Sequence, residues 1–236
     1  MQTLPIVENN PRQSDYMEAY MDSTGKYNIR LATVEDAPKL LDIYSYYVKN
    51  TAITFEYDVP DEEEFRGRIE TVLRDFPYLV VEEVISDSQK SHETSEKCKP
   101  DKSDDLTKSK PSRILGYAYA SKFHPRAAYQ WCVEMSIYLD KDCKRAGLGR
   151  ALYEELEKRL KDMGILNLYA CIGYPEKEDE YLTFDSVRFH EKMGYKLNGE
   201  FHKCGYKFGR WYNMVWMEKM IGEHGDNPCI KSYQHT

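Results

Sequence analysis

The stretch Cys143–Leu160, CKRAGLGRALYEELEKRL, contains a turn that opens into a helix. Two cations, Lys144 and Arg145, precede Gly147 and Gly149, and leucines then recur at helical spacing. Glycines let a backbone approach a ligand without a Cβ in the way, and the first amides of a helix carry partial positive charge. We therefore interpret the turn as a pyrophosphate cradle to which the cations add charge. A glycine turn with solvated cations is the alternative.

The two common nucleotide-binding motifs do not match this turn. The P-loop pattern GxxxxGK[ST] is absent, and the dinucleotide pattern GxGxxG would need its third glycine at Leu152. What remains is a strand, a cation, the pattern x-x-Gly-x-Gly and a helix.

The elements around the turn predict a mixed sheet with helices on its faces. In WCVEMSIYL, 131–139, apolar side chains alternate, which is typical of a strand. The helix after the turn is expected to end at Gly164. The other expected strands are 27–31, 78–85, 114–123, 167–172 and 210–220. The other expected helices run from the cap Thr33 to Val48, from the cap Asp61 to Phe76, and over 186–193.

The 236 residues are enough for one large domain, which we place at 27–220. Residues 1–26 and 221–236 are expected to be tails. The segment 86–112 has one large aliphatic residue and no aromatic residue. Such a segment cannot bury enough surface to offset its ordering entropy, so we interpret it as a disordered insert.

Composition excludes several classes of partner. The formal net charge of −7 disfavours nucleic acid. No stretch reaches the roughly 18 apolar residues of a membrane span, and the N-terminus lacks the apolar core of a signal peptide. The six cysteines are scattered without zinc spacing, so no metal is expected. Reduced thiols of this kind indicate a cytoplasmic protein.

The turn and its surroundings resemble the acetyl-CoA site of the GNAT superfamily of N-acetyltransferases. Six blocks in the same order resemble its phosphinothricin acetyltransferase branch, across roughly residues 27–220. These are NTAITFE (50–56), GYAYA (116–120), RAAYQWCVEMSIY (126–138), GLGRALYEEL (147–156), SVRFHEKMGY (186–195) and GYKFGRWYNMVW (205–216). The resemblance implies an α+β fold whose mixed, mostly antiparallel sheet is splayed to admit acetyl-CoA as co-substrate.

The resemblance also implies which residues bind acetyl-CoA. The turn and the start of the helix would contribute Lys144, Arg145, Ala146, Gly147, Leu148, Gly149 and Arg150. The backbone amides of Ser136, Ile137 and Tyr138 would contact the acetyl carbonyl and the pantetheine arm. The branch usually shows Pro-Asn after the next strand, whereas Pro175 is followed here by Glu176 and an acidic insertion. Asp185 or Ser186 is a candidate replacement for that asparagine.

Glu134 is the candidate general base. A carboxylate in the middle of a strand is costly unless it faces a wet cleft, and desolvation there would raise its pKa toward neutrality. The resemblance places the base of the branch at this position. A structural ion pair is the alternative.

Four further residues are candidates for the acceptor site. The resemblance implies that Arg126 and Tyr129 bind anionic groups of the substrate and that Phe55 forms an apolar wall. His190 falls where the branch also has His-Glu, as a second titrating group. The alternatives are a solvated loop arginine, plain core packing for Phe55 and a packed helix histidine. The aromatic last hairpin implies a homodimer or, alternatively, a monomer core.

The sequence thus predicts acetyl transfer to the α-amine of a small anionic amino acid, such as phosphinothricin or methionine sulfoximine. Acetylation of a peptide N-terminus or a lysine is one alternative. A non-catalytic acyl-CoA-binding sensor is another, although a pure binder has no use for Glu134. A Rossmann-type redox enzyme is disfavoured by the missing third glycine.

Overall fold

The computed structural model describes residues 20–21, 26–84, 113–143 and 147–231. The predicted insert 86–112 lies outside the described residues, as do Lys144, Arg145 and Ala146 of the turn. Within the described part of the chain, no helix is both long and apolar enough to cross a membrane.

One sheet organises the molecule, and its strand order is β1-β2-β3-β4-β5-β6-β8-β7. All neighbouring strands are antiparallel except β5 and β6, which are parallel. The α+β fold expected from the sequence is therefore confirmed. The strands are β1 (Tyr20–Met21), β2 (Tyr27–Leu31), β3 (Tyr78–Glu83), β4 (Ile114–Lys122), β5 (Cys132–Leu139), β6 (Asn167–Tyr174), β7 (Lys196–Lys207) and β8 (Arg210–Met220).

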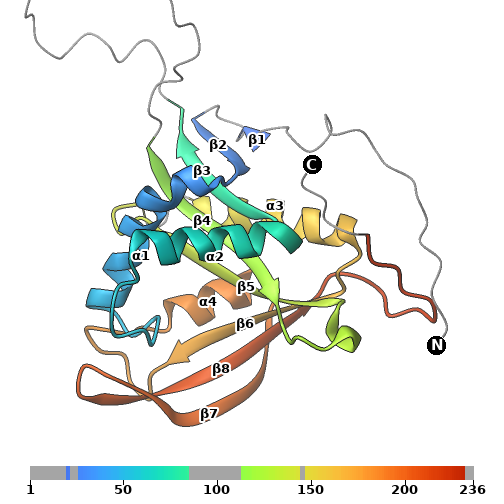
Figure 1. Cartoon of the computed structure of the whole chain (residues 1–236). Coiled ribbons are helices and arrows are strands. Elements are labelled where there is room, and N and C mark those ends of the chain that lie inside the picture. The colour runs from blue at the N-terminus through green and yellow to red at the C-terminus, as the bar shows by residue number, and fades with distance from the viewer. Residues whose placement is uncertain (1–19, 22–25, 85–112, 144–146, 232–236) are drawn as a thin grey trace, which may run out of the picture.

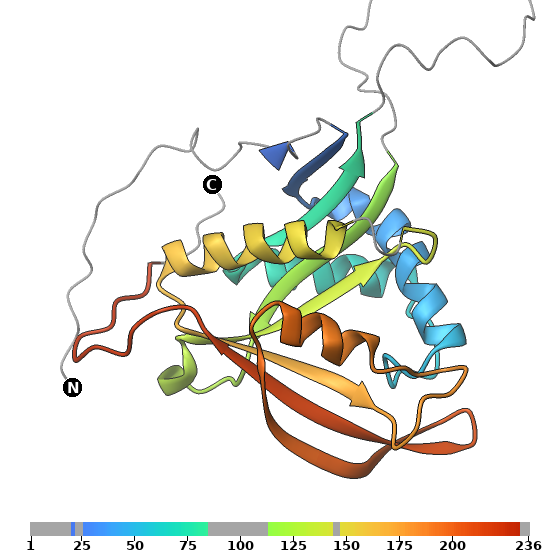
Figure 2. The same ribbon diagram turned by 180° about the vertical axis from the view of Figure 1, so that it is seen from behind.

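Helices cover both faces of the sheet (Figures 1 and 2). They are α1 (Ala37–Asn50), α2 (Glu62–Asp75), α3 (Leu148–Met163) and α4 (Asp185–Lys192), with short 3₁₀ turns η2 (Val34–Asp36) and η4 (Ala127–Tyr129). On one face, α1 and α2 bury a tyrosine-rich core against β3 and β4. On the other, the leucine stripe of α3 packs on the alternate residues of β3 to β6 and β8. The period-2 alternation of each strand thus supplies two cores.

The predicted helix signals act as expected. The Asp61 side chain accepts the N–H of Glu64 at 2.8 Å and caps α2. Gly164 ends α3 in the left-handed region at φ 90°. At the last hairpin, Phe208 and Gly209 both have positive φ, as a two-residue hairpin turn requires.

Three parts of the fold were not expected. The strand β7, at the edge of the sheet beside β8 and mostly exposed, is not among the predicted elements. Within the expected N-terminal tail, Tyr20–Met21 pairs with β2. At the C-terminal end, the N–H of Ile221 donates to Leu166 O and that of Lys231 donates to Met163 O. Residues 221–231 therefore extend along the loop between α3 and β6 instead of leaving the domain at once.

Candidate active site

The parallel strands β5 and β6 separate in the middle of the sheet (Figure 1). They pair at only three positions, the last of which is Glu134 with Tyr169. Beyond it, β5 continues to Leu139 and β6 to Tyr174 without pairing to each other. The stretches 135–139 and 170–174 therefore border an opening through the sheet, which we call the gap.

The strand register decides which backbone groups face the gap. Asp140 donates its N–H to β4, at Leu115 O, whereas Trp131 O faces β6 and accepts the N–H of Asn167. Because backbone groups alternate along a strand, even-numbered residues of β5 bond to β4 and odd-numbered ones face β6. Among the three amides expected at the acetyl-CoA arm, only that of Ile137 thus faces the gap. The register assigns the amides of Ser136 and Tyr138 to the ladder with β4, whereas the sequence prediction placed all three amides at the acetyl-CoA arm.

Glu134 lies where β5 and β6 part and is half-buried. Its side chain is on the face opposite the α3 core, because Val133 and Met135 point into that core. Burial raises the pKa of its carboxyl group. Among the described residues, the carboxylate has neither an ion-pair partner nor a hydrogen-bond donor. Nothing in the described structure thus supports the structural ion pair, and the group is free to accept a proton.

His190 is 3% exposed and lies on the other side of the gap. Its Nδ1 is 2.7 Å from Ser186 O, and its Nε2 is 3.0 Å from the Tyr153 hydroxyl. Because a carbonyl oxygen only accepts, Nδ1 carries the hydrogen and Nε2 accepts from Tyr153. Burial lowers the pKa of His190 to about 4, so the ring is neutral near pH 7. Both nitrogens are therefore occupied, which favours a packed, positioning histidine.

The N-terminus of α3 lies at the open end of the gap. No side chain caps it, no acidic residue occurs in its first turn, and the first intrahelical bond is from Ala151 N–H to Gly147 O. The N–H groups of Leu148, Gly149 and Arg150 precede that bond and so lack an intrahelical acceptor. Such a group of amides suits a pyrophosphate. The Arg150 side chain pairs with Glu154 at 3.3 Å on the surface.

The two glycines of the turn have different roles. Gly147 adopts a φ of 79°, which L side chains rarely adopt, and a Cβ there would project into open space. Gly149 is buried, and a Cβ there would lie 3.4 Å from both Ile137 Cδ1 and Phe189 Cε2. The space beside Gly149 is therefore bordered by protein side chains. Its missing side chain lets the first turn of α3 pack against β5 and α4.

The predicted acceptor residues lie in two separate places. Arg126 and Tyr129 are exposed at η4, just before β5. The ring centroids of Tyr129 and Phe123 lie 6.0 Å apart. Phe55 follows α1 and stacks on Tyr212 at the start of β8. It is part of a small apolar cluster and does not line the gap cavity, in keeping with plain core packing.

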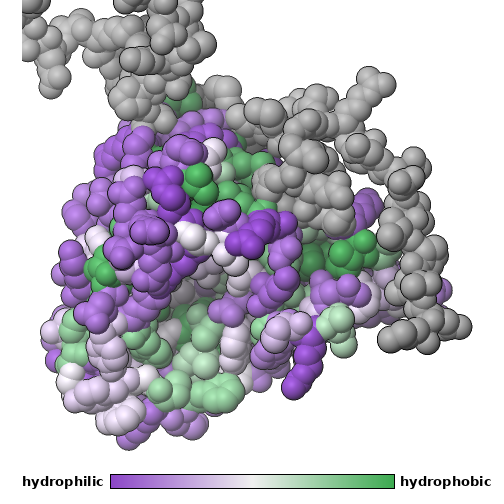
Figure 3. All heavy atoms as spheres, in the orientation of Figure 1, coloured by the Kyte–Doolittle hydropathy of each residue, from purple (hydrophilic) through white to green (hydrophobic). Residues whose placement is uncertain are grey.

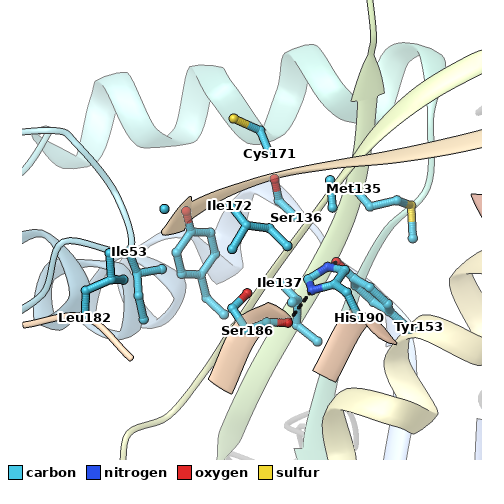
Figure 4. Close-up of a pocket in the computed structure, with 13 residues that line it drawn as sticks. Ile53, Met135, Ser136, Ile137, Tyr153, Cys171, Ile172, Leu182, Ser186 and His190 are labelled. Carbon is cyan, nitrogen blue, oxygen red and sulfur yellow. Dashed lines mark hydrogen bonds between the residues drawn. The ribbon is translucent and has the colours of Figure 1, made fainter. Parts of the chain in front are cut away.

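A cavity of about 60 Å³ lies in the gap and is lined by residues of β5, β6, α3 and α4, among others (Figure 4). The sequence predictions had included five of its lining residues, namely Ser136, Ile137, Tyr138, Ser186 and His190. Tyr153, Ile53 and Leu182 were missed. Tyr153 follows a leucine of the α3 stripe and was read as part of a helix, although a hydroxyl on an apolar helix face is a signal of a polar partner. The other lining residues are Met135, Ala170, Cys171, Ile172 and Gly173.

These features fit an extended, phosphorylated thioester such as acetyl-CoA. The uncapped amides of α3 suit its pyrophosphate, and the free N–H of Ile137, a residue that lines the cavity, suits an amide or carbonyl of its arm. A sheet opened between parallel strands, with such a helix end beside the opening, suits the class of proteins that hold an extended, phosphorylated ligand within the sheet.

Comparisons with known proteins agree with this class. The acetyltransferase (GNAT) domain family matches residues 106–216. A phosphinothricin N-acetyltransferase from Alcaligenes faecalis is 30% identical over 194 residues, which cover 82% of each chain. An L-methionine sulfoximine/L-methionine sulfone acetyltransferase from Pseudomonas aeruginosa is 26% identical, over 81% of this chain and 92% of that one.

A solved structure also matches along most of the chain. It is a GNAT superfamily phosphinothricin acetyltransferase from Sinorhizobium meliloti in complex with acetyl-CoA. It superposes with a TM-score of 0.69 at 28% identity and covers 88% of this chain and 96% of that one. The chain belongs to the GNAT acetyltransferases, in the branch of the phosphinothricin N-acetyltransferases. It is an N-acetyltransferase with acetyl-CoA as its co-substrate.

Proposed function

We propose that the enzyme acetylates the α-amine of a small anionic amino acid or analogue, of the phosphinothricin and methionine sulfoximine kind, with Glu134 as general base. The observation that carries this proposal is the half-buried Glu134 carboxylate, without a partner among the described residues, at the point where β5 and β6 part. The relatives from Alcaligenes faecalis and Pseudomonas aeruginosa support the acceptor class.

Each residue then has a defined task. Acetyl-CoA, when bound, supplies an acetyl group activated as a thioester. The amides at the start of α3 hold the pyrophosphate, and the N–H of Ile137 donates to the thioester carbonyl as negative charge develops on it. Glu134 removes one proton from the ammonium, so that the nitrogen lone pair can form the N–C bond while the C–S bond breaks. CoA leaves as the thiolate and takes up the second proton that the nitrogen loses. The raised pKa of Glu134 brings it closer to the pKa of the amine and makes this transfer less unfavourable.

His190 and Tyr153 have a positioning role in this proposal. The neutral imidazole cannot take a second proton readily, since burial lowers its pKa to about 4. By accepting from the Tyr153 hydroxyl and donating to Ser186 O, it fixes one wall of the cavity between α3 and α4. Glu134 thus remains the candidate base, and His190 holds the α3 and α4 side of the cavity in position.

Arg126 is proposed to bind the anionic group of the acceptor. It is exposed, precedes β5 on the acceptor side of Glu134, and forms no ion pair within the described part of the chain. The planar guanidinium can grip a carboxylate or phosphinate with two hydrogen bonds. The neighbouring Tyr129, which is 37% exposed, offers a hydroxyl group to the same ligand.

The acceptor class is tested by thiol release from acetyl-CoA against anionic amino-acid analogues, their uncharged amides, N-terminal peptides and lysine. We expect the anionic analogues to be the best acceptors. Arg126→Ala should raise their KM by about tenfold, in line with the roughly 1.5–3 kcal/mol of a charged hydrogen bond, and leave the amides unchanged. Preference for peptides or lysine would favour the protein-modifying alternative, and no release with any amine would favour a sensor.

We further propose a homodimer through the β7–β8 hairpin. β7 is an edge strand, and aromatic residues are exposed on the hairpin, including Phe201 at 52% and Trp211 at 60%. Hydrophobic patches interrupt the hydrophilic surface in the lower part of Figure 3, where Figure 1 draws this hairpin. A long edge with exposed apolar groups is normally covered. Sedimentation velocity should give a dimer that Phe201→Glu dissociates, whereas a monomeric wild-type protein at micromolar concentration would contradict the proposal.

A further inference from the structure

The acidic insertion between β6 and α4 folds into a closed turn. The Asp179 Oδ1 atom accepts the N–H groups of Tyr181 and Leu182, each at 2.8 Å, and the N–H of Asp179 donates to Leu182 O at 3.0 Å. These bonds fix the direction in which the Leu182 side chain points. We call residues 176–184 the clasp.

The outer side of the clasp is fastened to the last hairpin. Asp179 Oδ2 accepts from Arg210 at 3.0 Å and from the Tyr212 hydroxyl at 2.9 Å. Glu180 forms a bidentate ion pair with the same Arg210, and Tyr181 stacks on Phe208 at 4.2 Å. Burial opposes ionisation of Asp179, but its hydrogen bonds outweigh burial and lower its pKa. The acidic charges of the clasp are thus used to hold it in place.

The inner side of the clasp closes one end of the cavity. Tyr181 O accepts the N–H of Ala52 at 3.0 Å, which ties the clasp to the loop after α1. Leu182 is 3% exposed and packs beside Gly173, where a Cβ would lie 3.4 Å from Leu182 Cδ2. Figure 4 shows Leu182 and Ile53 together at one side of the cavity, with His190 and Tyr153 at the other.

This apolar wall lies on the donor side of Glu134. The parallel strands β5 and β6 run from the η4 end, which carries Arg126, to the end where the clasp begins. A charged acceptor is expected at the Arg126 end, because hydrocarbon walls penalise ions. The wall formed by Leu182 and Ile53 suits the acyl group, which is apolar.

We propose that Leu182, held in position by Asp179, restricts the acyl group that the enzyme transfers to acetyl. The inference rests on the proposed function, because it requires the thioester to lie in the gap. Leu182 lines the cavity at one side, so its side chain occupies space that a longer acyl chain would need there. Removing the Leu182 side chain beyond Cβ would open the space that a propionyl or butyryl chain needs. Asp179 acts through Leu182 and is a positioning residue.

The test compares acetyl-, propionyl- and butyryl-CoA as donors, with methionine sulfoximine as the fixed acceptor. Leu182→Ala should raise the ratio of kcat/KM for butyryl-CoA to that for acetyl-CoA by at least about tenfold, since one methylene in a pocket discriminates by 10–200-fold. The control Leu41→Ala removes a partly buried leucine of α1 outside the cavity and should leave the ratio unchanged. If Leu182→Ala does not fold, Leu182→Val should shift the ratio in the same direction.

Asp179→Asn gives a second readout. It keeps the size of the side chain but removes the carboxylate charge that pairs with Arg210. The ratio of kcat/KM for butyryl-CoA to that for acetyl-CoA should therefore rise, but by less than in Leu182→Ala. A purely structural clasp would lower the melting temperature and leave the ratio unchanged. An unchanged ratio in Leu182→Ala, with acetyl transfer retained, would overturn the inference alone. A wild-type protein that transfers no acyl group from any donor would instead overturn the proposed function.

Discussion

Glu134→Gln is expected to lower turnover near neutral pH by roughly 10²–10⁴, the usual contribution of a positioned general base. Glutamine keeps the size of the side chain and a hydrogen-bonding group but cannot accept the ammonium proton. Acetyl-CoA binding should survive, because Glu134 is not one of the groups proposed to bind it. The N–H of Ile137 lies further along β5, and the uncapped amides of α3 follow after the end of that strand. Steady-state rates and calorimetric affinities for both proteins measure the two effects separately. Near wild-type turnover at pH 7 would remove Glu134 from the mechanism.

Thermal stability distinguishes this role from a structural one. A carboxyl group whose pKa is raised on folding lowers stability once the pH exceeds its ordinary pKa, because the folded state then disfavours the ionised form. At pH 7, Glu134→Gln should therefore leave the melting temperature unchanged or raise it. If Glu134 were instead held in an ion pair, Glu134→Gln should lower the melting temperature at pH 7. Glu70→Gln, at an exposed position on α2, is the matched control and should change neither turnover nor melting.

Gly149→Val should destabilise the fold and weaken acetyl-CoA binding together. A Cβ at Gly149 would already lie 3.4 Å from Ile137 and Phe189, so the two methyl groups of valine must push α3 away from β5 and α4. Overpacking of this kind costs about 1–3 kcal/mol of unfolding free energy. The displaced first turn would no longer aim its free amides at the pyrophosphate. Denaturant titration and calorimetry with acetyl-CoA measure the two losses.

Gly67→Val provides the control for this prediction. Gly67 is also a helical glycine, in α2, but a Cβ there would have no atom within 4 Å. Because valine has a higher helix propensity than glycine, this variant should be as stable as the wild type or slightly more so. Equal unfolding free energies of the two variants would show that Gly149 is not a packing position. Wild-type acetyl-CoA affinity in Gly149→Val would show that the first turn of α3 does not bind the pyrophosphate.

Local signals in the sequence predicted most of the fold. Asp61 and Gly164 act where the backbone leaves unpaired groups, so their effect does not depend on distant contacts. The strand β7 was missed because its side chains are mostly exposed and thus show no apolar alternation. The clasp was missed because its four acidic residues suggested solvent. Two of them, Asp179 and Glu180, pair with Arg210, which lies about thirty residues away, and sequence spacing cannot reveal such a partner.

The site was predicted unevenly for a similar reason. Glu134 was predicted mainly because the family resemblance places the base of the branch there, and because a carboxylate in the middle of a strand is costly unless it faces a wet cleft. The choice of Ile137 over Ser136 and Tyr138 required the register with β4, which only the folded sheet supplies. Leu182 looks like an ordinary apolar residue in a polar segment, and its place at the cavity depends on the turn that Asp179 closes.

The pH dependence of the ratio of wild-type to Glu134→Gln turnover tests the central claim most directly. If Glu134 removes the ammonium proton, the ratio should be large near pH 7 and shrink as the pH rises toward 10, because more of the amine then arrives already deprotonated. Steady-state thiol release from about pH 6 to 10, with saturating acetyl-CoA, measures it. A ratio that stays constant across this range would contradict the assignment of Glu134 as the base.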